Sequence, residues 1–322
     1  MRAPPRKVFL AAQWIAAAAV LFFVGRQLVS QWTDFRAQPL EARPLWWAVV
    51  LSGAIVLGVY ALLVQTWRVL LVEAGESLSF WRAARIWSIS NLWRYVPGKI
   101  WQIPVMSGLA RRENVSATAA AGSAVLSTVL NIATGLAIVL LLGWRWVDLI
   151  SPNARLLAVT LIVIAAIGLL LLPFVLARFG TWVGRLLQRE VQLGAPPART
   201  LLVATVGNAV AWLLYGIAFM WLVRGIIGDA PGATWQYVAV YTASYVVGYL
   251  VLIAPGGIGV REGVMVALLP SLGLATPKQA LLIAGASRVW LTILEIVPGV
   301  LFLAQDIARR RSTNPPTDGP QD

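Results

Sequence analysis

Long apolar segments separated by short polar stretches dominate the chain. Several of them reach about 20 residues, the length a helix needs to cross the hydrocarbon core of a membrane. These segments are residues 8–28, 45–66, 115–142, 155–176, 200–223 and 279–304. The pattern predicts an all-α polytopic membrane protein with about six transmembrane helices.

Two further stretches are apolar but interrupted. Residues 78–110 are broken at Pro97–Gly98, and residues 235–276 are broken at Pro255–Gly256–Gly257. Proline and glycine end helices, and a break at membrane depth survives only if protein buries it or a water-filled cavity solvates it. Since neither stretch is long enough for two crossings, we expect two re-entrant helical hairpins with their tips inside the membrane.

The two hairpins predict an inverted repeat. One follows a span that runs inward and the other a span that runs outward, so they would enter from opposite sides. Their sequences are alike, with NLWRYVPGKIWQ beside YLVLIAPGGIGVRE, and a long span follows each. Such repeats are typical of secondary transporters, whose substrate site lies where broken helices meet. Chance is the alternative, because the chain contains 18 Pro and 27 Gly.

Composition narrows the class of protein further. The chain is 59% hydrophobic and only 12% charged, against about 25% charged residues in a soluble domain. A cleaved signal peptide is disfavoured for the first segment, because no soluble domain follows it. The absence of Cys and His excludes thiol chemistry, imidazole catalysis and the usual zinc sites. We expect no cofactor, no metal and no catalytic residue.

The basic residues predict the topology. Most of the 26 Lys and Arg residues fall on the side of the N-terminus, which the positive-inside rule assigns to the cytoplasm. Both termini are then cytoplasmic, in the inner membrane of a bacterium or archaeon. The net charge of +13 reflects this topology and contact with anionic lipid rather than with nucleic acid. We expect one transmembrane domain, residues 1–311, and a disordered cytoplasmic tail, residues 312–322.

The second hairpin carries the most informative motif. Gly256, Gly257 and Gly259 would let backbone amides approach a ligand, and a helix starting near residue 260 would direct its positive end at the tip, a favourable anion site. Arg261 and Glu262 then place charges in the membrane, where ionisable groups are costly and usually functional. A structural pairing that locks the hairpin is the alternative.

Charged residues recur on the last span and in the first hairpin. Arg288, Thr292 and Glu295 share one helical face, and Glu295 would pair with Arg261, as Arg288 would with Glu262. A purely structural role for these pairs stays open. Around the first break, the basic side chains could bind a phosphate or simply extend to the membrane surface. The candidate substrate-binding residues are Arg94, Tyr95, Pro97, Gly98, Lys99, Gln102, Asn131, Pro255, Gly256, Gly257, Gly259, Arg261, Glu262, Arg288, Thr292 and Glu295.

Two blocks, RYVPGKIWQ and PGGIGVREGVMVALL, carry a family resemblance. With them, residues 8–305 resemble the transmembrane region of lysylphosphatidylglycerol synthase and its stand-alone flippase-like relatives. The resemblance implies a lipid flippase that moves aminoacylated phosphatidylglycerol, or a companion of glycosyltransferases that use polyprenyl carriers. The chain departs from the pattern because it lacks a soluble aminoacyl-transfer domain. It also has Ser127 and Asn131 where relatives often place an acidic residue.

Three hypotheses follow for the function. The leading one is a flippase-like lipid translocase or lipid-binding transporter for an anionic phospholipid or a polyprenyl-phosphate-linked lipid, bound at a midplane cavity. The second is an accessory subunit of a partner synthase or glycosyltransferase. The third is a lipid-linked transferase with Glu262 or Glu295 as base, which the missing His, Cys and Asp-x-x-Asp cluster disfavour.

Overall fold

The computed structural model describes residues 44–95, 101–143, 196–250, 257 and 259–313, and within these ranges the secondary structure is entirely helical. The predicted spans 8–28 and 155–176 lie outside the described residues. The other four predicted spans are confirmed as α2 (Trp46–Glu73), α5 (Ala117–Gly143), α8 (Ala198–Ile227) and α11 (Pro277–Thr313). Each contains an 18-residue window with a mean hydropathy between 1.8 and 2.3, long and apolar enough to cross a membrane.

The last helix is longer than expected. The predicted span covers residues 279–304, whereas α11 runs from Pro277 to Thr313. A helix of 37 residues is about 55 Å long, so it extends well beyond a hydrocarbon core of about 30 Å.

Both predicted hairpins are present as pairs of short helices. The first consists of α3 (Phe80–Asn91), the 3-10 turn η1 (Leu92–Tyr95) and α4 (Gln102–Arg111). The second consists of α9 (Thr234–Leu250) and α10 (Val260–Ser271). The longest of these helices, α9 with 17 residues, measures about 26 Å, which is shorter than a hydrocarbon core of about 30 Å.

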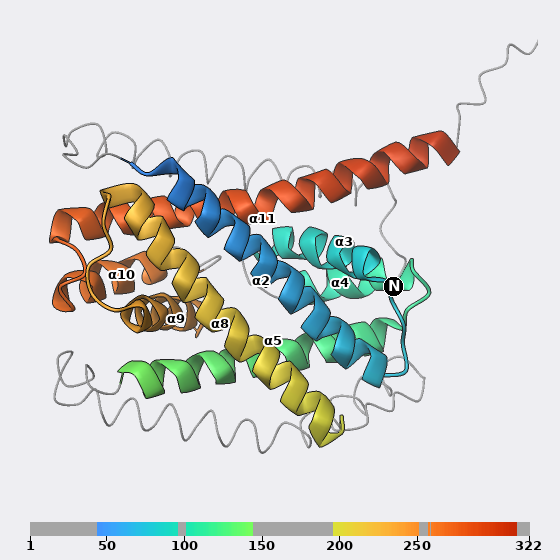
Figure 1. The fold of residues 1–322 in the computed structure, drawn as a ribbon. Coiled ribbons are helices and arrows are strands. Elements are labelled where there is room, and N and C mark those ends of the chain that lie inside the picture. The colour runs from blue at the N-terminus through green and yellow to red at the C-terminus, as the bar shows by residue number, and fades with distance from the viewer. Residues whose placement is uncertain (1–43, 96–100, 144–195, 251–256, 258, 314–322) are drawn as a thin grey trace, which may run out of the picture.

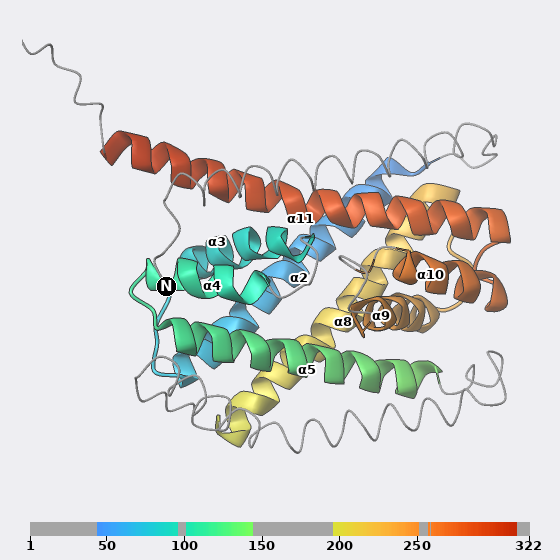
Figure 2. The same ribbon diagram turned by 180° about the vertical axis from the view of Figure 1, so that it is seen from behind.

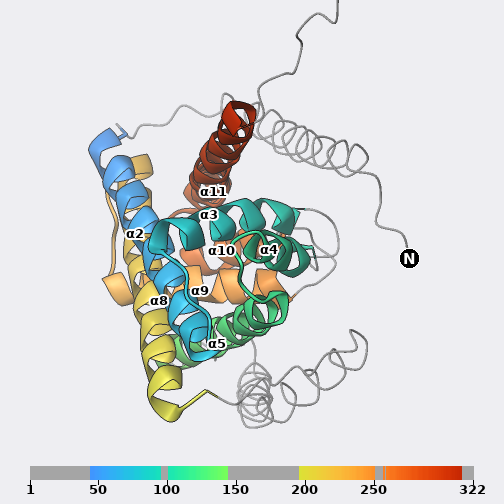
Figure 3. The same cartoon turned by 90° about the vertical axis from the view of Figure 1, so that its right-hand side faces the viewer.

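The two hairpins lie in different halves of the molecule, and described residues of both line one pocket. In Figure 1, α3 and α4 occupy the right half and α9 and α10 the left half, while α2 and α8 run antiparallel beside them. The view from behind shows α11 along one side of the hairpins and α5 along the other (Figure 2). Seen from the end, α2 and α8 form a third side (Figure 3).

The two halves of the chain pack in the same order, which agrees with the predicted inverted repeat. The first half contains α2, the hairpin α3–α4 and α5, and the second contains α8, the hairpin α9–α10 and α11. Helix α5 packs against α9 of the other half, and α11 packs against α3. Each hairpin is therefore held between the spans of its own half and the final span of the other half.

Small residues let the helices approach closely, as is common between membrane helices. Gly216 on α8 faces the backbone of α9 at Val238, and Gly207 on the same helix faces the side chain of Thr66 on α2. The hydroxyl of Ser52 on α2 donates a hydrogen bond to the carbonyl of Ala218 on α8. These contacts fix the distance between α8 and its two neighbours.

An ion-pair network holds the first hairpin near the start of α3 and the end of α4. Arg85 on α3 bonds both to Glu113, in the turn between α4 and α5, and to Asp306 on α11, the latter at 2.8 Å. Arg82 lies 3.3 Å from the same Glu113 carboxylate. The network joins the first hairpin to the final span of the other half.

The packing of α8 on α9 generates a prediction. A methyl group at Gly216 would overlap the backbone of Val238, which a rotamer change cannot relieve, so Gly216→Ala should destabilise the protein by about 1–3 kcal/mol. The matched control is Gly58→Ala on α2, because the added methyl group at Gly58 meets open space. Unfolding in detergent measures both variants, and equal stability of the two would contradict the close packing.

Candidate functional site

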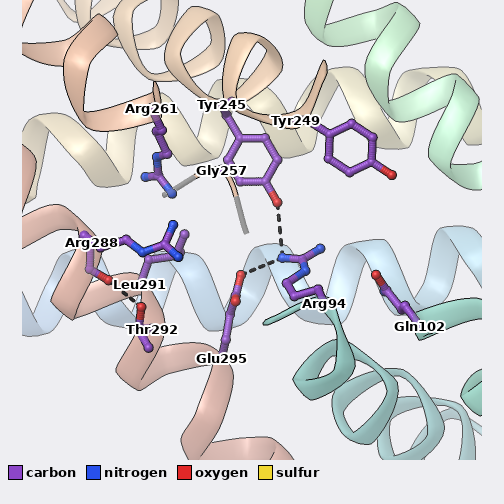
Figure 4. Close-up of a pocket in the computed structure, with 11 residues that line it drawn as sticks. Arg94, Gln102, Tyr245, Tyr249, Gly257, Arg261, Arg288, Leu291, Thr292 and Glu295 are labelled. Atoms are coloured by element: carbon purple, nitrogen blue, oxygen red, sulfur yellow. Dashed lines mark hydrogen bonds and ion pairs between the residues drawn. The ribbon is translucent and has the colours of Figure 1, made fainter. Parts of the chain in front are cut away.

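A pocket of about 50 Å³ lies between the described ends of the two hairpins, at η1 and the start of α4 on one side and the end of α9 and the start of α10 on the other. Its walls come from η1 and α4 of the first hairpin, α9 and α10 of the second, and α11 (Figure 4). The lining residues are Arg94, Gln102, Tyr245, Gly248, Tyr249, Gly257, Arg261, Arg288, Leu291, Thr292 and Glu295. One water needs about 10–15 Å³ in such a cavity, so the pocket accommodates about four waters or one phosphate-sized group.

One ion pair connects the two halves of the chain inside this pocket. Nη1 of Arg94 donates to Oε1 of Glu295 at 2.7 Å and to the hydroxyl of Tyr245 at 3.2 Å. Arg94 belongs to the first hairpin, whereas Tyr245 and Glu295 belong to the second half. We expected Arg261 to pair with Glu295, but the salt bridge is made by Arg94. The η1 turn places Arg94 beside α11, and no sequence spacing indicates such a contact.

Arg261 is held by aromatic rings. Its side chain is 3% exposed, and its guanidinium lies 4.9 Å from the ring centre of Tyr241 and 5.4 Å from that of Tyr245. Ring faces attract a cation but accept no strong hydrogen bond. Within the described part of the chain, Nε and Nη2 of Arg261 have no hydrogen-bond partner.

Two glycines allow the start of α10 to pack on the end of α9. A Cβ at Gly248 would lie 3.1 Å from Cβ of Arg261, and a Cβ at Gly257 would lie 2.8 Å from the carbonyl oxygen of Gly248. Gly257 also has a φ of +71°, which favours glycine. These close contacts bring Arg261 to the wall of the pocket.

Glu262 has a structural role at the start of α10. Its Oε2 accepts a hydrogen bond from the backbone N–H of Gly259 at 2.6 Å, as in half of a capping box. Its Oε1 lies 3.8 Å from Nη1 of Arg288, so the predicted pairing of these two residues is confirmed. The end of α10 that we expected to bind an anion thus already carries a carboxylate of the protein.

The other predicted residues divide into three groups. Arg288, Thr292 and Glu295 share the pocket-facing side of α11, as their spacing predicts, and Gln102 lines the pocket while donating to Asn91 at 2.5 Å. Asn131 instead donates to Asn208 on α8 at 2.9 Å, and neither it nor the exposed Gly259 lines the pocket. The backbone of Tyr95 ends η1, while Pro97, Gly98, Lys99, Pro255 and Gly256 lie outside the described residues.

The structure adds four lining residues that the sequence analysis missed: Tyr245, Gly248, Tyr249 and Leu291. Tyrosines recur every four residues along α9, at positions 241, 245 and 249. That spacing places their side chains on one helical face, which leads directly to the second break. The tyrosine spacing could have predicted Tyr245 and Tyr249 as lining residues. Nothing in the sequence distinguishes Leu291 from the other apolar residues of its span.

Basic side chains outnumber acidic ones among the described residues that line the pocket. Three arginines and one glutamate line it, and guanidinium groups bind phosphate and carboxylate oxygens well. Among the described residues, no cluster of three or more acidic side chains could hold a metal ion.

The ion pair between the halves generates a prediction. Removing one partner of a buried pair leaves a charge uncompensated and is strongly destabilising, so Glu295→Gln and Arg94→Gln should each lower stability. The double variant should lose less than the sum of the two, with a coupling energy of about 0.5–3 kcal/mol. Unfolding of the four proteins in detergent measures the coupling, and additive losses would show that the pair contributes nothing.

Comparison with known proteins agrees with the resemblance seen in the sequence. The family model of the lysylphosphatidylglycerol synthase transmembrane region matches residues 9–299, a range that contains every lining residue of the pocket. A search of curated proteins found no match. The family implies a membrane protein tied to lipid modification, which the apolar spans support. The chain therefore belongs to the family of the lysylphosphatidylglycerol synthase transmembrane region and is a multi-pass membrane protein.

Proposed function

We propose that the protein is a lipid translocase or lipid-binding transporter. Its substrate is a phospholipid or a polyprenyl-phosphate-linked lipid, and the pocket between the hairpins binds the phosphate. The observation that carries the proposal is the position of the pocket, lined by Arg94, Arg261 and Arg288, where two broken helical hairpins meet. Substrate sites of transporters built from inverted repeats lie at such meeting points.

The physical task of a lipid translocase explains these residues. The acyl chains of a lipid stay in the hydrocarbon as it changes leaflets, but its charged headgroup must cross a medium that cannot solvate it. A cluster of guanidinium groups supplies the charge and the hydrogen bonds that water supplies at the membrane surface. The protein thereby lowers the barrier without any covalent change in the lipid, so no catalytic base is needed.

The arrangement of the halves provides a route for alternating access. Arg94 belongs to the first half and Glu295 to the second, and their ion pair is 2.7 Å long. Rocking one repeat against the other would part these residues and change the side to which the pocket opens. The phosphate then takes the place of Glu295 as the partner of Arg94.

The charge pattern completes the proposal. Both termini face the cytoplasm of a bacterium or archaeon, because most of the basic residues lie on that side. A synthase or glycosyltransferase that makes or consumes the lipid is the expected partner. The protein would then supply the transport step that such an enzyme needs.

Reconstitution tests the proposed activity. We expect the purified protein in liposomes to accelerate the movement of fluorescent phospholipids or polyprenyl phosphates between leaflets, measured by quenching of the outer leaflet. Arg261→Ala should reduce the rate to that of protein-free liposomes, because it removes a buried guanidinium from the pocket.

The matched control is Arg224→Ala. Arg224 also lies over an aromatic ring, 5.4 Å from the centre of Trp221, but it is exposed at the end of α8 and does not line the pocket. The Arg224→Ala variant should transport lipid as the wild type does. Equal rates for wild type and Arg261→Ala with every lipid tested would refute the proposal.

A further inference from the structure

Tyr245 on α9 contacts an arginine from each half of the chain. Its hydroxyl oxygen accepts a hydrogen bond from Nη1 of Arg94 at 3.2 Å, and the guanidinium of Arg261 lies 5.4 Å from the centre of its ring. Arg94 belongs to the first hairpin, whereas Arg261 lies in the first turn of α10 in the second. Figure 4 shows the Tyr245 side chain between these two arginines. One side chain therefore contacts two cations that line the same pocket.

Other aromatic side chains hold the ring of Tyr245 in place. Trp212 on α8 meets it edge-on, with the ring centres 5.3 Å apart and an interplanar angle of 72°. Tyr241, one turn earlier on α9, stacks with it at 6.2 Å and 26°, and Tyr241 in turn stacks with Tyr215 of α8 at 5.5 Å. Aromatic pairs with these geometries are stabilising beyond the area that they bury. The position of the Tyr245 hydroxyl is therefore set by the packing of α8 on α9, within the second half.

Arg94 bonds both to Tyr245 and to Glu295, and these two partners differ in charge. The carboxylate of Glu295, at 2.7 Å, is an anion, whereas the hydroxyl of Tyr245 is neutral. In the proposed transport cycle, a phosphate replaces Glu295 as the partner of Arg94. Carboxylate and phosphate compete for the same guanidinium because both are anions, but a neutral hydroxyl does not have to leave. The contact with Tyr245 can therefore persist while the anionic partner of Arg94 is exchanged.

From these contacts we propose that Tyr245 is a positioning residue for the phosphate group of the lipid. Its hydroxyl keeps Arg94 at the pocket while Glu295 is exchanged for the phosphate, and its ring keeps Arg261 beside the same place. Guanidinium groups from both halves then bind one phosphate. Ordering a long side chain costs free energy on binding, and a contact that fixes it beforehand reduces this cost. The inference rests on the proposed function and names the residue that prepares its site.

Tyr245→Phe tests the hydroxyl, because it keeps the ring under Arg261. Native mass spectrometry of the full-length protein measures the affinities for phosphatidylglycerol, a polyprenyl phosphate and diacylglycerol, each added separately. We expect the variant to bind the phosphate lipids that the wild type binds about tenfold more weakly, the effect of roughly one hydrogen bond to a charged group. Diacylglycerol has no phosphate, so it should bind equally to the variant and to the wild type.

The matched control is Tyr237→Phe on the same helix. The hydroxyl of Tyr237 donates a hydrogen bond to the carbonyl oxygen of Pro231 at 2.6 Å, and neither residue lines the pocket. The control therefore also loses one tyrosine hydrogen bond from α9. It should bind all three lipids as the wild type does, whatever its effect on folding. Unfolding of the lipid-free proteins in detergent records that effect separately.

Two further variants separate the hydroxyl from the ring. Adding Tyr245→Phe to Arg94→Gln should cause no further loss of affinity for the phosphate lipids, because the hydroxyl acts through Arg94. Tyr245→Leu removes the ring as well, so it should weaken binding more than Tyr245→Phe does. The reason is that Arg261 then keeps only the ring of Tyr241 of the two that it contacts.

The results separate this inference from the proposed function. Equal affinity of Tyr245→Phe and wild type for the phosphate lipids would overturn the inference, even if the protein moves lipids in liposomes. An equal loss for diacylglycerol, or a further loss on top of Arg94→Gln, would also overturn it, because the contact with Arg94 would then not be the cause. A wild type that neither binds nor moves a phosphate lipid would refute the proposed function and the inference with it. The expected losses of affinity without any transport would support the inference and refute the proposed translocase.

Discussion

A charge inside a membrane needs an opposite charge, a hydrogen-bonding partner or a polar cavity, because hydrocarbon solvates none. The centre of this protein is organised by that requirement. Arg94 and Glu295 come from different halves of the chain and meet at 2.7 Å. Arg288 lies near Glu262, and Arg261 rests on Tyr241 and Tyr245. The pocket lies where these groups gather, beside the described ends of both hairpins.

The backbone satisfies the same requirement by different means. An interrupted helix leaves amide groups without partners, which is tolerated in a membrane only inside protein or beside a cavity. At the second break, the carboxylate of Glu262 accepts the N–H of Gly259, and Gly257 packs directly on the backbone of Gly248. Glycine is needed there because a side chain would separate α10 from α9 and move Arg261 away from the pocket. The close backbone contact between α9 and α10 therefore also determines the position of the Arg261 guanidinium.

The packing of the two halves places this centre between them. Because each hairpin lies between its own half and the final span of the other half, a movement of one half changes the walls of the pocket. The Arg94–Glu295 pair crosses the boundary between halves, whereas the contacts of Arg261 with the tyrosines of α9 stay within the second half. In the proposed transport cycle, a phosphate bound at Arg261 would travel with the second half, while the pair at the boundary would break and re-form.

The sequence by itself predicted the four spans that the structure describes and the two helix pairs of the hairpins, because helix length, apolar content and Pro–Gly breaks are local properties. It also determined the pocket-facing side of α11, since Arg288, Thr292 and Glu295 follow the helical period. It did not determine the partners of the charges. The sequence favoured Arg261 for Glu295 and a lining position for Asn131, but Arg94 makes the salt bridge and Asn131 binds Asn208 on α8. These contacts join residues far apart in the chain, so only the packing of the helices, through close approaches such as that of Gly248 and Gly257, could decide them.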